Sequence, residues 1–488
     1  MDYSQFLAMK QEISLLVLFL LVFLNDTFMP RSAQNAIGKI TCILFGLFTL
    51  WGFCPVVIGS GLTDAFSGMY ETSPAIVAIK NILNIGVLIV LIQSLKWTAS
   101  EHQVIRRGEF YELVLVTLFG MYLMISGRHF LVFIIGLECA SLPLAAMVAF
   151  NKHRYESNEA AVKYVLTAVF SSAVLLMGLS LLYGLTGSLY FNGIAYGILG
   201  AEMDGMFLLV VALAFVISGM GFKLSLVPFH LWTADVYEGA PTSVTSYLSV
   251  ISKGSAAFAF LVILWQVFGQ IYADAWEWML YAVIILTITV GNLFAIRQKN
   301  LKRFLAFSSI SQAGYIMLGI IADNLMGEAA LMYYILVYIF SNLAAFGVIG
   351  AIENNTGKVS MDDYNGLYKT NPRLAFTMML AMFSLAGIPP FAGFFSKFFI
   401  FTSAINQGSV AIYVLVLIAL INTIISLYYY LLVVKAMFIK NEEECTIAPF
   451  RSACSERLGM WICVAGIILL GLVSCVYDSL LNVVGFSF

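Results

Sequence analysis

The chain consists largely of a series of apolar segments, and these restrict its fold more than any other feature. Each segment is about 20 residues long, the length an α-helix needs to cross the hydrocarbon core of a bilayer. Apolar residues make up 61% of the 488 residues and charged residues only 11%, well below the share usual in soluble domains. The segments follow one another without a soluble insert. The sequence therefore predicts an all-α polytopic membrane protein with a single membrane domain over residues 1–488.

We count fourteen such segments. They lie near residues 6–24, 37–58, 74–95, 109–127, 129–150, 160–184, 206–230, 241–268, 274–296, 302–322, 327–352, 372–404, 409–434 and 458–484. The twelfth is too long for one straight helix and must be bent or broken. The first could be taken for a signal peptide, but Lys10 and Glu12 interrupt it and no small-residue cleavage site precedes Asn25. We therefore interpret it as the first span.

Lysine and arginine residues test this count, because cytoplasmic loops are enriched in them. Eighteen lie at the loops that follow odd-numbered spans, whereas Lys10 and Arg128 lie on the other side. The eighteen are Arg31, Lys39, Lys96, Arg106, Arg107, Lys152, Arg154, Arg297, Lys299, Lys302, Arg303, Lys358, Lys369, Arg373, Lys435, Lys440, Arg451 and Arg457. This asymmetry predicts fourteen spans with both termini outside.

Ionisable residues within the spans are the main candidates for function. Placing an unpaired charge at that depth costs several kcal/mol of free energy, so such residues usually either form ion pairs or lie on an ion or proton pathway. They are Lys80, Lys163, Lys223, Lys253, Lys397 and Glu138. Lys80 and Lys163 lie near span ends, where a side chain that snorkels to the surface is the simpler explanation. For the other four we favour function over the alternative, a static ion pair between helices.

Prolines interrupt the two spans that hold Lys223 and Lys397. Pro228 lies in GFKLSLVPFHLWTADVYEGAPT, and a double proline lies in SLAGIPPFAGFFSKFFIF. A proline frees a backbone carbonyl that lipid cannot satisfy, so each break should line a polar path enclosed by protein. The broken spans, 7 and 12, are five apart. This spacing predicts two inverted five-helix repeats, spans 4–8 (about 109–268) and spans 9–13 (about 274–437).

The sequence contains no pattern typical of a redox centre or a nucleotide site. The seven cysteines form no CxxC pair, the four histidines are scattered, and neither a phosphate loop nor a GxGxxG motif occurs. A net charge of −2 without a basic block gives no indication of nucleic-acid binding. The energy for any transport must therefore come from a gradient or from a partner.

Three stretches carry a family resemblance: GFKLSLVPFHLWTADVYEGAPT, KNLKRFLAFSSISQAGY and SLAGIPPFAGFFSKF. They resemble signature stretches of the antiporter-like membrane subunits of respiratory complex I, the NADH:quinone oxidoreductase, and of the related Mrp-type cation/proton antiporters. The resemblance extends from about span 4 to span 13. Among these subunits the chain is most similar to the N branch of the bacterial enzymes, since FHLWTADVYEGAPT and Lys397 both fit that branch.

The resemblance implies a proton-translocating subunit of the bacterial cytoplasmic (inner) membrane. In that membrane the charge asymmetry predicts both termini on the periplasmic side. It implies that FMN, iron–sulfur clusters and quinone bind in partner subunits, and that the partners include sibling antiporter-like subunits, small membrane subunits and the lipid bilayer. Glu138 and Lys223 would form the pair of the first half-channel. Lys253 would be the connecting residue and Lys397 the residue of the exit half-channel.

Four further positions bear on the resemblance. Lys163 and His230 match family positions, so both are added as candidate site residues. Two residues depart from the family pattern: Ala234 replaces a usual proline, and Gln312 replaces a common histidine. Because glutamine does not titrate, no protonation role passes to that position. Two other functions remain open, a self-standing cation/proton antiporter and a structural spacer of a membrane arm.

The charge asymmetry gives a first testable prediction. A reporter that is active only in the cytoplasm should remain silent when it is fused after Phe488, because that end is predicted to lie outside. The same reporter inserted after Arg154 should be active. Activity at Phe488 would contradict the span count.

Overall fold

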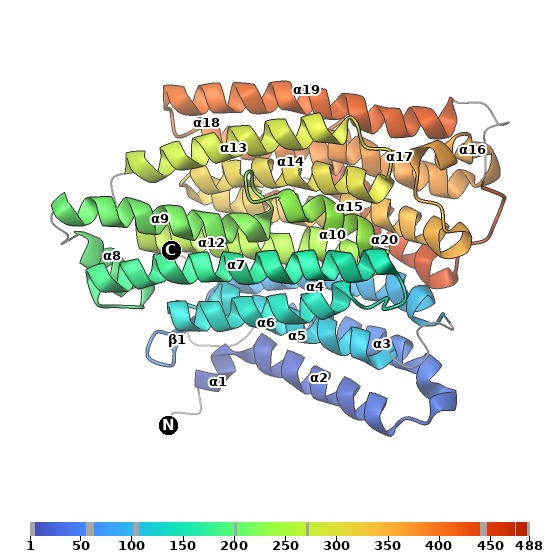
Figure 1. The fold of residues 1–488 in the computed structure, drawn as a ribbon, viewed down its shortest axis with the longest axis horizontal. Coiled ribbons are helices and arrows are strands. Elements are labelled where there is room, and N and C mark those ends of the chain that lie inside the picture. The colour runs from blue at the N-terminus through green and yellow to red at the C-terminus, as the bar shows by residue number, and fades with distance from the viewer. Residues whose placement is uncertain are drawn as a thin grey trace.

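The computed structural model describes residues 5–54, 63–100, 107–199, 203–269, 273–439, 447–473 and 475–485. Its long helices run side by side along one direction (Figure 1). Among these residues, thirteen helical segments are long and apolar enough to cross a membrane. They are α2 (Lys10–Phe28), α3 (Ile37–Gly52), α4 (Pro74–Thr98), α5 (Arg107–Ser126), α6 (Phe130–Val148), α7 (Tyr155–Thr186), α9 (Met203–Leu224), the continuous segment Thr242–Phe268, α13 (Ala273–Ala295), α14 (Leu301–Ile321), α15 (Leu325–Thr356), α19 (Val410–Phe438) and α20 (Cys454–Leu472).

These thirteen segments correspond to thirteen of the predicted spans, and the polytopic helical fold is confirmed. The predicted twelfth span consists of two shorter helices, α17 (Pro372–Ala386) and α18 (Ala392–Ile405), separated at the double proline. The seventh is broken as well, because α9 ends at Leu224 and α10 (Leu231–Gly239) begins after Pro228. The total of fourteen spans and the inverted repeats remain predictions.

The segment Thr242–Phe268 is itself composite. It contains α11 (Thr242–Tyr247), a π-helical turn η3 (Leu248–Ser252), α12 (Lys253–Ile263) and a second π-helical turn η4 (Leu264–Phe268). In a π-helical turn the backbone bonds span five residues instead of four, and such turns occur frequently at functional sites.

The remaining elements are short and lie between the long helices. They are α1 (Gln5–Ala8), η1 (Arg31–Ala36), α8 (Phe191–Leu199), η5 (Met361–Tyr364), α16 (Leu367–Thr370), α21 (Cys475–Gly485), and the antiparallel strands β1 (Thr63–Ala65) and β2 (Tyr70–Thr72). The β1–β2 hairpin is a small departure from the all-α prediction. The last predicted span also differs, since α20 ends at Leu472 and a separate short helix follows. Arg106, Lys440 and both chain ends, including Phe488, lie outside the described residues.

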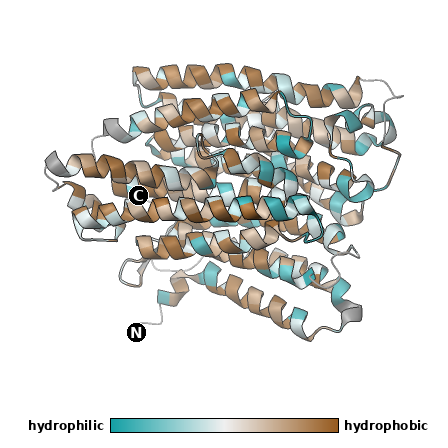
Figure 2. Cartoon of the chain, viewed as in Figure 1, coloured by the Kyte–Doolittle hydropathy of each residue, from teal (hydrophilic) through white to brown (hydrophobic). Residues whose placement is uncertain are grey.

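Hydrophobic residues cover most of the helices, while hydrophilic residues gather toward the end that carries α16 (Figure 2). The helices differ strongly in how far the protein encloses them. The most apolar stretch of α14 is completely buried, and 94% of the corresponding stretch of Thr242–Phe268 and 89% of that of α15 are buried, against 28% for α2. These three central helices are therefore where polar side chains can lie away from lipid.

Close backbone contact fixes α6 against α5. A Cβ atom on Gly120 would lie 2.4 Å from the Ala140 nitrogen, and one on Gly136 would lie 2.6 Å from the Met124 nitrogen. Small residues allow membrane helices to approach in this way. The contact sets the position of α6, which carries Glu138.

The structure corrects the interpretation of Lys80. Its side chain does not snorkel but is 1% exposed, and its Nζ forms an ion pair with Glu12 Oε1 at 2.5 Å. Beside this pair, Gln11 donates a hydrogen bond to Asn81 at 2.8 Å, and Asn81 donates to the Gly52 carbonyl at 3.0 Å. These contacts join α2, α3 and α4. The physical reason is that a carboxylate within reach makes a buried ammonium more favourable than one extended toward the surface.

This pair gives the second prediction. Lys80→Met leaves the Glu12 carboxylate buried without its partner, which costs about 3–5 kcal/mol. The double variant Glu12→Leu/Lys80→Met removes both charges and should recover most of that loss. The apparent melting temperature of the purified protein measures the effect, and Lys39→Met, at an exposed position of α3, serves as the control. A double variant no more stable than Lys80→Met would contradict the pairing.

Candidate functional site

Lys223 lies in the last turn of α9, just before the break of that span, and its side chain is buried. Its Nζ donates a hydrogen bond to Ser141 Oγ of α6. Glu138 lies three residues earlier on the same helix and is half-buried. It interacts electrostatically with Lys223, but no hydrogen bond or close ion pair joins these two described residues. In this conformation, therefore, the serine hydroxyl and not the expected carboxylate contacts the ammonium.

Lys253 is the first residue of α12, directly after the π-helical turn η3, and it is 2% exposed. Its Nζ lies 2.5 Å from Ser309 Oγ and 3.3 Å from the Ser309 carbonyl oxygen of α14. The ring of Tyr237 lies 5.6 Å away, and the Tyr237 hydroxyl is 3.4 Å from Ser309 Oγ. Neutral oxygens and an aromatic face thus surround this ammonium.

Lys397, on α18, occupies a position that the double proline creates. Pro389 and Pro390 have no N–H, so the carbonyls four residues earlier, those of Leu385 and Ala386, cannot receive their usual helical hydrogen bonds. The Lys397 ammonium donates to both carbonyls, at 3.0 and 3.1 Å. The carboxyl end of a helix also favours a cation. The ring of Tyr315 lies 5.0 Å from the ammonium.

Gln312 of α14 connects the surroundings of Lys397 to those of Lys253. Its Nε2 donates to the Leu385 carbonyl at 3.3 Å and to the Tyr430 hydroxyl at 3.1 Å, while Tyr334 donates to its Oε1. The Tyr430 hydroxyl lies 2.5 Å from the hydroxyl of Ser308, the residue next to Ser309.

A cavity of about 10 Å³ also lies beside Gln312 and Lys397, enough for about one water molecule. Sequence reasoning missed the hydroxyl partners Ser141, Ser308, Ser309 and Tyr430. The run of serines in SSIS, within an otherwise apolar span, is the signal that could have indicated two of them.

His230 lies between the first two lysines along the chain, at the start of α10. Its side chain is half-buried and interacts electrostatically with Lys253. Within the described residues, no direct hydrogen-bonded connection joins Lys223 to Lys253. The structure therefore joins Lys397 and Gln312 at the Leu385 carbonyl. Lys253 contacts Ser309, the chain neighbour of the Ser308 that Tyr430 contacts, and Lys223 contacts Ser141.

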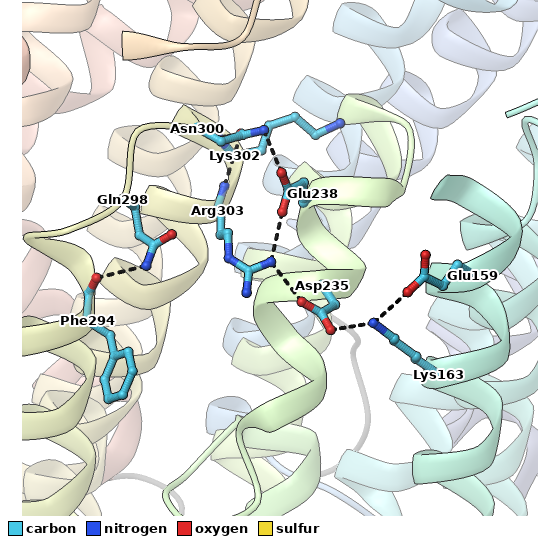
Figure 3. A network of polar contacts seen from close by, with 9 residues as sticks. All are labelled: Glu159, Lys163, Asp235, Glu238, Phe294, Gln298, Asn300, Lys302 and Arg303. Carbon is cyan, nitrogen blue, oxygen red and sulfur yellow. Dashed lines mark hydrogen bonds and ion pairs between the residues drawn. The ribbon is translucent and has the colours of Figure 1, made fainter. Parts of the chain in front are cut away.

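Lys163 belongs to a different network, near the surface (Figure 3). Its side chain is 42% exposed, and its Nζ lies 2.6 Å from Asp235 Oδ2 and 2.8 Å from Glu159 Oε1. Arg303 of α14 donates to Asp235 and to Glu238, both at 2.8 Å. Burial alone would raise the pKa of Asp235, but the hydrogen bonds from Lys163 and Arg303 outweigh it and lower this pKa. The network ties α7, α10 and α14 together.

The family model of the membrane region of NADH:quinone oxidoreductases and Mrp antiporters matches residues 127–426, more than half of the chain. The chain belongs to this family. The family resemblance of the three sequence stretches is thereby confirmed.

Individual relatives agree with this assignment. The NADH-quinone oxidoreductase subunit N of Phocaeicola vulgatus is 52% identical over 481 residues, which cover 98% of this chain and 99% of the relative. A chain of respiratory complex I from Thermus thermophilus with bound aureothin is 31% identical, with a TM-score of 0.77 over 95% of this chain and 97% of that one. A chain of the Mrp complex from Dietzia sp. has a TM-score of 0.82 over 100% of this chain and 97% of that one. At 21% identity, that last likeness shows the fold alone.

Proposed function

We propose that this chain is the N subunit of a proton-pumping NADH:quinone oxidoreductase and that its buried lysines carry protons through the membrane domain. One observation supports the lysine assignment best. Lys223, Lys253 and Lys397 contact neutral oxygens. In contrast, Lys80, Lys163 and Lys302 all contact carboxylates.

The type of partner matters because it decides whether a buried lysine can change its charge. A carboxylate at contact distance stabilises the ammonium strongly and keeps it protonated. Hydroxyl and carbonyl oxygens stabilise it less, so the charged and neutral forms lie closer in free energy. Lysines that contact hydroxyl or carbonyl oxygens can therefore release and take up a proton during turnover.

In this proposal the buried lysines and Glu138 have distinct roles. Lys223 exchanges a proton with the first half of the domain, and Glu138 modulates its charge from a neighbouring turn of α6. Lys253 holds the proton at the centre, beside His230. Gln312 and the tyrosine hydroxyls around it connect Lys253 to Lys397, which passes the proton toward the exit. Lys163 positions α7 against α10 and does not carry the proton itself.

The proposal extends to the architecture and the partners. The domain comprises the two inverted repeats, about residues 109–268 and 274–437, and lies in a bacterial inner membrane. Redox chemistry with FMN, iron–sulfur clusters and quinone takes place in partner subunits. Sibling antiporter-like subunits and small membrane subunits flank the chain. The chain acts as a translocase component, driven by quinone reduction elsewhere in the complex.

A self-standing cation/proton antiporter is the alternative, since the family model that matches this chain describes Mrp antiporters as well as NADH:quinone oxidoreductases. Purification from native membranes separates the two functions, because a complex I subunit migrates together with flavin and iron–sulfur subunits on a native gel. A chain that exchanges cations for protons without such partners would support the antiporter.

The lysine assignment leads to the third prediction. Lys253→Met and Lys397→Met should each lower proton pumping and quinone reduction together by about tenfold or more, because turnover requires the proton to move. Fluorescence quenching of a pH-sensitive dye in inside-out vesicles measures pumping, and a native gel verifies assembly. Lys152→Met, in a loop, is the control. Normal pumping by both buried-lysine variants would show that these lysines do not carry protons and would favour the role of a structural spacer.

The bridging role of Gln312 gives the fourth prediction. Gln312→Leu keeps a similar volume but removes the polar atoms that contact Leu385, Tyr430 and Tyr334, so pumping should fall several-fold while the complex assembles. Gln11→Leu removes a similarly buried glutamine from the N-terminal helices and should leave pumping intact. Equal pumping by the two variants would show that Gln312 is not part of the proton path between Lys253 and Lys397.

A further inference from the structure

A cavity of about 830 Å³ opens at the amino-terminal ends of α17 and α20, beside the segment that precedes α20. Its lining comes from residues 370–380 and 450–464. The charge asymmetry predicts that both helices begin on the cytoplasmic side. On that prediction the cavity lies at the level of the inner leaflet of the bilayer. None of its lining residues belongs to the proposed proton path.

Three arginines line this cavity. Arg373 lies in the first turn of α17, Arg457 in the first turn of α20, and Arg451 in the segment before α20. None of the three forms an ion pair with a described carboxylate, whereas Arg154 and Arg303, from other inner loops, each form one. The Arg457 Nε atom is buried and has no hydrogen-bond partner among the described residues. The cavity therefore holds three positive charges that the described part of the chain does not neutralise.

The amino end of α17 adds to this positive potential. The residue before the helix, Asn371, does not cap it with its side chain. Its Nδ2 instead donates a hydrogen bond to the Ala448 carbonyl at 3.3 Å, and its Oδ1 accepts one from the Phe450 N–H at 3.2 Å. These bonds hold the segment that carries Arg451 against the start of α17. Because the first N–H groups of a helix attract anions, this end favours an anionic group in the cavity.

Away from the arginines the lining becomes apolar along both helices. On α17 the lining continues from Arg373 to Leu380, and on α20 it continues from Arg457 through Trp461 to Val464. Residues seven apart lie on the same face of a helix, about 10 Å apart along its axis. The Trp461 side chain is 67% exposed, and tryptophan is enriched where a membrane protein meets the lipid headgroups. The cavity thus has a cationic end and an apolar end.

We propose that this cavity binds an anionic phospholipid of the inner leaflet, with its phosphate at the three arginines and its acyl chains along α17 and α20. Basic pockets between membrane helices on the cytoplasmic side bind such headgroups. The planar guanidinium group matches the geometry of a phosphate. Ligand cavities commonly measure about 300–1,000 Å³, so there is room for a headgroup and the first part of its chains.

The bound lipid would fasten α17 to α20. α17 is the first half of the broken span and ends at Ala386, whose carbonyl contacts the Lys397 ammonium. A short helix of this kind buries less surface than a full span, so a lipid that joins its other end to a neighbour would stabilise it. The proposal rests on the cavity and its charges and does not require that the chain moves protons.

The first test uses the unmodified protein, purified in detergent with its native partners and stripped of lipid. Tetraoleoyl cardiolipin, dioleoyl phosphatidylglycerol and dioleoyl phosphatidylcholine are added separately, and native mass spectrometry measures the lipid that remains bound. The two anionic lipids should bind at least tenfold more tightly than phosphatidylcholine and should raise the apparent melting temperature. Tighter binding of cardiolipin than of phosphatidylglycerol would show that both of its phosphates are held, and equal binding that one is. Equal binding of all three lipids, or equal stabilisation by inorganic phosphate alone, would overturn the proposal.

The second test locates the site. The triple variant Arg373→Gln/Arg451→Gln/Arg457→Gln should bind phosphatidylglycerol at least tenfold more weakly, because it loses the charge-assisted hydrogen bonds to the phosphate. The control Lys39→Gln/Lys152→Gln/Arg297→Gln removes the same charge from exposed positions outside the cavity and should bind normally. An equal loss in both triple variants would mean that the general charge of the inner face attracts the lipid, and the site would be wrong.

A third comparison leaves every charge in place and covers the case in which the arginine variant does not assemble. Thr377 lines the cavity on α17 and is half-buried, so Thr377→Trp should fill the space for the acyl chains and weaken phosphatidylglycerol binding several-fold. Met379→Trp, at a half-buried position of the same helix that does not line the cavity, is the control and should bind normally. Equal binding by the two tryptophan variants would overturn the proposal.

Discussion

The centre of the C-terminal half of the chain depends on one interaction: the buried Lys397 ammonium donates hydrogen bonds to the free carbonyls of Leu385 and Ala386. Pro389 and Pro390 take two N–H donors out of the span, and lipid could not satisfy the Leu385 and Ala386 carbonyls left behind. A lysine at the same depth would be equally unfavourable alone. Lys397 donates to both carbonyls. The carbonyls thereby gain hydrogen-bond donors, and the buried ammonium gains acceptors. The break in the helix and the charge are therefore one structural unit.

That unit can exist only where lipid is excluded, and the packing of the bundle provides such a place. α14 and α15 and the segment Thr242–Phe268 are almost completely enclosed by the outer helices. Lys253, Gln312 and the tyrosines around them all lie on or against these three helices. Peripheral helices such as α2 and α7 carry the exposed apolar surface instead. The enclosed helices form the polar interior and the outer ones isolate it.

Much of this organisation follows from the sequence alone, but the side-chain partners do not. Apolar length and the prolines were sufficient to predict the long helices and both breaks, because these depend on local chemistry. Partners depend on how each helix is rotated against neighbours far away in the chain. The partner of Lys80 is Glu12, at a separation of 68 residues in the chain. The partner of Lys223 is Ser141, at a separation of 82 residues. No local pattern distinguishes Ser141 from Glu138, since both lie on the same face of α6.

Lys223 shows why such a choice of partner has consequences beyond stability. A lysine side chain is long and flexible enough to reach either of two groups that lie one helical turn apart. Contact with the Glu138 carboxylate would hold the proton on Lys223, whereas contact with the Ser141 hydroxyl leaves the ammonium with a weaker partner. The conformation described here has the second contact. A rotation of α6 or α9 by a fraction of a turn would exchange the two. In the mechanism proposed above, such a small movement, transmitted from a partner subunit, would determine whether Lys223 keeps its proton or passes it on.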